Sequence, residues 1–62
     1  MNEGDGGDIY FEFTVIGATV KATAIDSVTG TEVSVIGPAA AARADLERLA
    51  LAKLRARLAR EA

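Results

Sequence analysis

The hydrophobic residues of this chain follow two different periods, and the change between them limits the possible folds. From Ile9 to Ile36, apolar residues recur mostly at every second position, which is typical of half-buried β-strands. From about Ala39 to Arg60 the chain is rich in Ala, Leu and Arg, and every residue is compatible with a helix. The sequence therefore predicts strands followed by one C-terminal helix, which is an α+β unit.

Three strands are expected. Residues 9–15 alternate most regularly, with Phe11 and Phe13 on the face that we expect to point inward. A tight turn at Gly17 returns the chain as a second strand over residues 19–25, with its alanines inward because Lys21 and two threonines are poor core residues. The stretch from Asp26 to Gly30 is a turn signal, and residues 31–36 form the third strand. This order predicts an antiparallel β-meander with the helix packed on one face.

The helix has two possible starts, because Pro38 suits a first helical position and Asp45 suits a cap. A helix over residues 39–60 would be about 33 Å long. A seven-residue strand spans about 23 Å, so roughly two turns would overhang the sheet. The leucines also spread over an arc of about 200° on a helical wheel, which is wider than one neighbour requires. These leucines are the candidate dimer contacts: Leu46, Leu49, Leu51, Leu54 and Leu58.

The size of the chain also favours self-association. It has 62 residues, and thirteen of its thirty-one apolar residues are Ala, so its core is thin. Domains this small usually need a disulfide, a metal or a partner subunit, and the chain has no Cys and no His. We therefore expect dimerisation to complete the fold. Helix packing, strand-edge pairing and exchange of an element are all possible modes.

Residues 1–8 are acidic and Gly-rich, and we expect them to be a flexible tail before a single domain over residues 9–62. The tail lacks the basic and apolar regions of a secretory signal. The longest uncharged stretch, residues 33–42, is too short to cross a bilayer. These features predict a soluble cytoplasmic protein without a membrane partner.

Short turn and helix motifs are spread over about three quarters of the chain: Tyr10, Glu12, Phe13, Thr14, Val20, Lys21, Thr29, Gly30, Thr31, Glu32, Val33, Ser34, Gly37, Pro38, Leu46, Glu47, Arg48, Leu49, Ala50, Lys53 and Leu54. Through these residues the chain resembles a family of short bacterial proteins of unknown function. The resemblance implies a strand-strand-strand-helix unit and no known activity, so it assigns no functional residue.

The composition gives little support to catalysis. Without His and Cys the usual base and the usual strong nucleophile are missing, so acid-base chemistry would fall to carboxylates, Lys21 or Tyr10. Glu12 and Glu32 could face each other if their strands are neighbours, but solvated surface acids are the favoured interpretation. We therefore predict no enzyme activity, no cofactor and no metal site. The favoured function is a protein-interaction or regulatory module, acting as a homodimer or with another protein.

The alternative function is nucleic-acid binding by the basic helix. Residues 38–62 carry six basic and three acidic groups, whereas residues 1–37 carry one lysine and six acidic groups. However, the basic residues point in many directions and have no aromatic residue among them, and helix dipole effects explain part of their placement. The candidate nucleic-acid contacts are Arg48, Arg55, Arg57 and Arg60.

Overall fold

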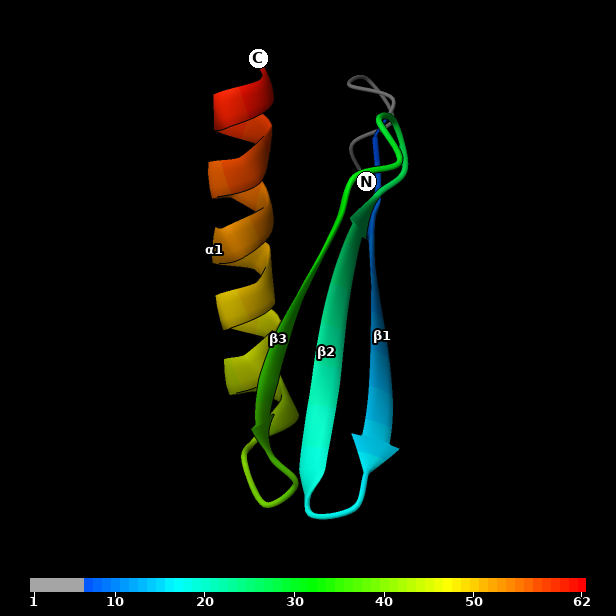
Figure 1. The fold of residues 1–62 in the computed structure, drawn as a ribbon. Helices are drawn as coiled ribbons and strands as arrows, with labels where there is room; N and C mark the ends of the chain where they lie inside the picture. The colour runs from blue at the N-terminus through cyan, green and yellow to red at the C-terminus, as the bar shows by residue number, and fades with distance from the viewer. Residues whose placement is uncertain (1–6) are drawn as a thin grey trace.

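A computed structural model describes residues 7–62, which form a three-stranded sheet covered on one face by a helix (Figure 1). The strands are β1 (Ile9–Ile16), β2 (Thr19–Asp26) and β3 (Glu32–Pro38), and the helix is α1 (Arg43–Glu61). Both strand pairs are antiparallel, in the order β1-β2-β3. The predicted α+β meander with a C-terminal helix is confirmed. Residues 1–6 of the predicted tail lie outside the described residues.

Both turns of the meander follow from their sequence. Gly17 has a φ of 59°, and glycine adopts this conformation at the first central position of a two-residue hairpin. In the second turn the Asp26 carboxylate accepts hydrogen bonds from the Thr29 backbone N–H at 2.9 Å and from the Thr29 hydroxyl at 2.7 Å. Gly30 supplies the positive φ of 78° that returns the chain to the ladder. The expected roles of Gly17, Asp26 and Gly30 are confirmed.

The strand register places the predicted apolar residues on one face of the sheet. Phe11, Ala24 and Val33 form one row across the three strands, and the next row contains Phe13 and Ala22. Val20, Ala22, Ala24 and Val33 are buried, together with three residues of α1. The inward orientation predicted for the alanines of β2 is therefore correct.

The helix begins between the two starts that the sequence suggests. Neither Pro38 nor Asp45 marks its start: Pro38 ends β3 opposite Thr19, and α1 begins at Arg43 after the N-cap residue Ala42. The backbone N–H of Ala39 donates to Ala18 at 2.8 Å and so prolongs the sheet. The chain then needs residues 39–42 to cross from the sheet to the helical layer. With 19 residues, α1 is about 28 Å long, close to the roughly 26 Å of an eight-residue strand, so the predicted overhang is wrong.

The helix covers β2 and β3 more than it covers β1. Leu46, Ala50 and Leu54 form its buried stripe, and Leu46 lies directly over Gly37. Small side chains on both layers, Ala22, Ala24 and Ala50, have no exposed surface. They let helix and sheet approach closely, because a methyl group occupies little space between the layers.

The two ends of α1 are tied to the sheet by polar contacts. The Arg43 guanidinium lies 4.8 Å from the centre of the Phe13 ring, a cation–π arrangement. At the other end, the Thr31 hydroxyl donates to the Glu61 carboxylate at 3.2 Å. No helix within residues 7–62 is long and apolar enough to cross a bilayer.

Candidate functional site

Large apolar side chains remain exposed on several surfaces of the described chain. They lie on the outer face of α1, at both ends of β1, on the outer face of the sheet and in the β2–β3 turn. Single exposed apolar residues are ordinary, but six in so small a domain leave a large uncovered area. The six residues, each more than half exposed, are Tyr10, Val15, Ile16, Val28, Ile36 and Leu49.

The outer face of α1 carries a shallow hollow around Leu49. This side chain is 59% exposed, and Leu51 and Ala52 continue the apolar lining. Arg48 and Arg55 form the basic part of its rim. The lining offers apolar contact beside positive charge, which suits binding of a protein surface. The residues that line it are Asp45, Arg48, Leu49, Leu51, Ala52 and Arg55.

The acidic part of the rim is Asp45, which forms an ion pair with Arg48 one turn along the helix. Their side chains are 59% and 72% exposed, so solvent screens the pair and it contributes little to stability. Arg55 makes no ion pair with another residue of the described part. Of the two arginines that line the hollow, Arg55 is therefore the one more available to an acidic group on a partner.

The five leucines predicted as dimer contacts occupy three different environments. The sheet of the same chain buries Leu46 and Leu54, and Leu58 packs against the core at its margin. Leu51 is half-buried, and Leu49 is exposed. While this fold is kept, Leu49 and the open part of Leu51 are what the helix offers to a second copy.

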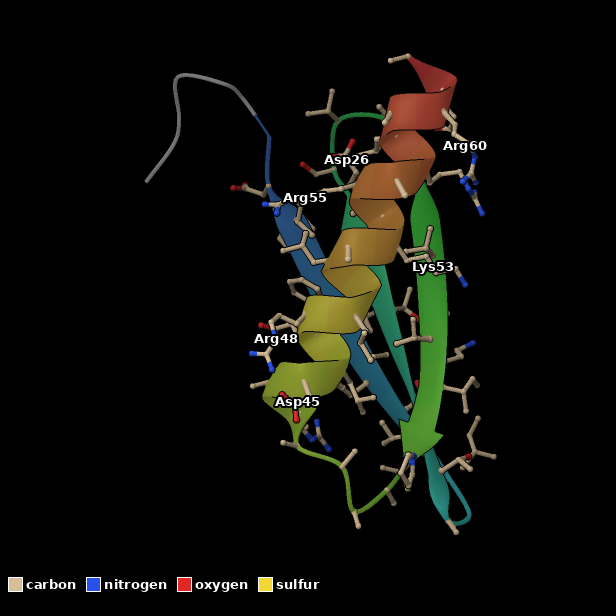
Figure 2. All side chains as sticks on the ribbon, turned by 90° about the vertical axis from the view of Figure 1, so that its left-hand side faces the viewer. Asp26, Asp45, Arg48, Lys53, Arg55 and Arg60 are labelled. Carbon is tan, nitrogen blue, oxygen red and sulfur yellow. The ribbon has the colours of Figure 1, made fainter. Side chains whose placement is uncertain are left out.

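The arginines predicted for nucleic-acid binding do not form one stripe. Figure 2 shows Arg48 and Arg55 on the β1 side of the helix, whereas Arg60 lies with Lys53 on the β3 side. Arg57 is half-buried, unlike the other three. A groove-binding helix needs its charges on one face to follow the phosphates, so this distribution is a poor match for nucleic acid.

The two edge strands differ in how well they are protected. Lys53 reaches the outer edge of β3, where its Nζ donates to the Ser34 carbonyl at 2.7 Å. Pro38, at the end of the same strand, has no backbone N–H to offer. Neither protection of this edge was predicted from the sequence. Pro38 was interpreted as a possible helix start, and a lysine on a helix gives no sign of the carbonyl that it will contact. No comparable side-chain contact reaches the outer edge of β1 in the described residues.

The outer face of the sheet has a polar centre between apolar margins. Thr23 is only 7% exposed although no helix covers it, because its neighbours on the sheet surround it. Its hydroxyl forms a 2.8 Å hydrogen bond with the Ser34 hydroxyl on β3. Glu12 pairs with Thr23 and Glu32 with Ile25, so these two carboxylates lie in different rows of strands that are not neighbours. The carboxylate pair considered from the sequence is not formed.

Among the acidic residues that the structure describes, Asp26 is the one whose pKa is clearly displaced. The Thr29 hydroxyl and the Thr29 N–H, both bonded to its carboxylate, lower the pKa of Asp26 below the usual 3.8. This shift has a structural cause in the turn and moves the carboxyl away from neutral pH, where a general base would be needed. In residues 7–62, no three carboxylates gather closely enough to hold a metal ion.

Comparison with known families agrees with this architecture. A family model described as a domain of unknown function, DUF6898, matches residues 6–61. The chain belongs to DUF6898. The match covers all four elements, so the resemblance to a family of unknown function with a strand-strand-strand-helix unit is confirmed. No curated protein and no solved structure matches this DUF6898 chain.

Proposed function

We propose that the chain is a non-enzymatic protein-interaction module that acts as a homodimer in the cytoplasm. The observation that carries this proposal is the exposure of six large apolar side chains on several surfaces of the described part of so short a chain. One partner cannot cover all of these surfaces at once. One surface serves self-association, and another remains for a different protein.

The small core supports self-association. Among residues 7–62, only Leu54 combines a large side chain with complete burial, and three of the seven buried apolar residues are alanines. Each Å² of apolar area buried on folding stabilises the chain by about 25 cal/mol. In domains of this size the total barely exceeds the conformational entropy that the chain loses on folding. Apolar contacts with a second copy would add the area that the protomer lacks. The absence of cysteine is consistent with a reducing compartment.

The hollow on α1 is the surface that we assign to a protein partner. Leu49 supplies an apolar contact, and Arg55 stands beside it without an ion-pair partner in the described part. This arrangement fits a partner that presents an apolar side chain next to a carboxylate, because the carboxylate can pair with the guanidinium.

The first experiment measures mass. Sedimentation equilibrium from 1 to 100 µM should give twice the 6.4 kDa of one chain at the upper concentrations. A mass of one chain throughout this range would refute the homodimer.

The second experiment tests the hollow. A partner recovered with the wild-type chain should be lost with Leu49→Glu and retained with the control Ala59→Glu. Ala59 is also exposed on α1, about 15 Å further along the helix. Equal recovery with both variants would show that the hollow is not the contact surface.

A further inference from the structure

The outer edge of β1 is an unused row of hydrogen-bonding groups. The two-residue turn at Gly17 is closed by the pair Ile16 and Thr19, and such a closing pair is hydrogen-bonded. Backbone hydrogen bonds to β2 are then made by every second residue, so the N–H and C=O groups of the even-numbered residues of β1 point to β2. The N–H and C=O groups of Ile9, Phe11, Phe13 and Val15 therefore point to the open edge.

The same alternation explains the different state of β3. There the even-numbered residues point outward, which agrees with the Ser34 carbonyl receiving the Lys53 amine at the edge. Pro38 ends that row without a donor. β3 is therefore partly closed to another strand, whereas β1, with no proline from Ile9 to Ile16, is open.

We propose that β1 of a second copy pairs antiparallel with β1 about a two-fold axis at Phe13, giving a six-stranded sheet. This inference rests on the proposed homodimer and names its surface. In this register Phe13 faces the partner's Phe13, and Phe11 faces the partner's Val15. The Phe11, Phe13 and Val15 side chains of both protomers then lie on the face that carries α1. In one protomer alone, Phe11 and Phe13 are only half-buried there.

The register also pairs the exposed apolar ends of the strand. Tyr10 and Ile16 are each 55% exposed, and they lie at opposite ends of β1 on the outer face. Antiparallel pairing about Phe13 places Tyr10 opposite the partner's Ile16, and the symmetry repeats this contact. Val15, which is 59% exposed, is covered by the partner's Phe11. Strand β1 is thus complementary to itself, which an isologous dimer requires.

The charged side chains favour the register centred on Phe13 over the register centred on Glu12. Thr14 pairs with Lys21 within the protomer and would pair with the partner's Glu12 across the axis. Lys21 and the partner's Glu12 then flank one threonine in a single row about 10 Å wide, and both side chains are long enough to meet over it. Shifting the pairing to centre on Glu12 would place two glutamates directly opposite each other, which is destabilising.

Proline substitution tests the edge. Val15→Pro removes an outward N–H, which an edge strand tolerates, and should leave the helical circular dichroism signal unchanged. It should raise the dimer dissociation constant roughly tenfold to a hundredfold, because one hydrogen bond is lost from each chain. The matched control is Ile36→Pro, which removes an outward N–H from β3 and should leave the dissociation constant unchanged.

Cysteine pairing tests the register without relying on tolerance of proline. The chain has no cysteine of its own. In the proposed register Glu12 and the partner's Thr14 form a non-hydrogen-bonded pair, whose Cα atoms lie about 4.5 Å apart, within disulfide range. A mixture of Glu12→Cys and Thr14→Cys chains should oxidise to the mixed disulfide, identified by mass spectrometry. Glu12→Cys chains alone should not cross-link.

The outcomes distinguish the proposed homodimer from the proposed β1 interface. If wild type is dimeric and the mixed disulfide forms, both stand. If wild type is dimeric but Ile36→Pro or Leu49→Glu abolishes dimerisation while Val15→Pro does not, the β1 interface is wrong and the homodimer stands. Cross-linking of Glu12→Cys alone would overturn the register centred on Phe13. If wild type sediments as a monomer at 100 µM, the homodimer and its β1 interface both fail.

Discussion

Replacing Gly37 with alanine tests whether the close contact between β3 and α1 stabilises the fold. A Cβ atom at this position would lie 2.6 Å from Cδ2 of Leu46 and 3.7 Å from its Cγ. Carbon atoms in contact are normally about 3.5–4.0 Å apart, so the overlap is about 1 Å. Leu46 is only 4% exposed, which leaves little room for its side chain to rotate away.

The expected loss is about 1 kcal/mol. Overpacking a buried site costs roughly 1–3 kcal/mol. The φ of Gly37 is not positive, so alanine fits the backbone and recovers about 0.4–1 kcal/mol by restricting the unfolded chain. For a domain of this size, the net loss corresponds to a decrease in Tm of about 4–8 °C. We expect Gly37→Ala to unfold at lower urea concentration with an unchanged m-value.

A second substitution makes the reasoning refutable. Leu46→Val removes the Cδ atoms, so adding Gly37→Ala to it should be neutral or stabilising by up to about 1 kcal/mol. In the control background Leu54→Val, Gly37→Ala should still destabilise, because Leu54 does not touch the added methyl. Urea titrations followed at 222 nm, at one fixed protein concentration, measure all six chains. Equal effects of Gly37→Ala in both backgrounds would refute the proposed overlap.

Three further predictions concern charged side chains. Because the pKa of Asp26 is below its unfolded value of 3.8, its carboxylate stabilises the fold above that pH and this contribution is lost as pH falls through the folded pKa. Urea titrations between pH 2 and 5 should therefore show a weaker acid destabilisation in Asp26→Asn; an unchanged slope would contradict the role of the Thr29 bonds. Lys53→Met should lower the free energy of unfolding by less than about 1 kcal/mol, since its bond to Ser34 is exposed, and should increase aggregation measured by light scattering; unchanged aggregation would show that the lysine does not protect β3. Finally, the chain should give no mobility shift with DNA or RNA at low salt, and a shifted band abolished by Arg55→Ala would favour nucleic-acid binding instead.

Local patterns were enough to predict the sheet. The alternation along β1 and the turn residues Gly17, Asp26 and Gly30 act over a few positions, and each has the conformation expected from its chemistry. The inward face of β2 followed from the poor fit of Lys21 in a core. These signals are strong because the preferred local structure agrees with the final packing.

The start of the helix could not be predicted in the same way. Residues 39–42 are four alanines that favour a helix, but the chain must use them to cross between layers after Pro38. The length of that crossing depends on how closely α1 approaches the sheet, which is a tertiary property. Because the predicted helix was too long, the sequence suggested an overhang that does not exist.

The candidate binding residues could be predicted only in part, because they depend on how the helix packs on the sheet. A wheel shows that leucines occupy a wide arc, but not which part of the arc the sheet will cover. Gly37 leaves space for Leu46, which sets the rotation of α1 and leaves Leu49 outside. The open edge of β1 was foreseeable as a possibility, whereas the closure of β3 by Lys53 depended on the final position of the helix.

The fully enclosed alanines of the two layers have a consequence for protein engineering. Ala22 and Ala24 on β2 and Ala50 on α1 determine the thickness of the molecule, since any larger side chain there must push the helix outward. Along β1 the helix leaves Phe11 and Phe13 partly open, and this margin is the surface that the proposed dimer uses. A designer who wants a more heat-resistant variant should therefore leave both the three central methyl groups and the β1 margin as they are.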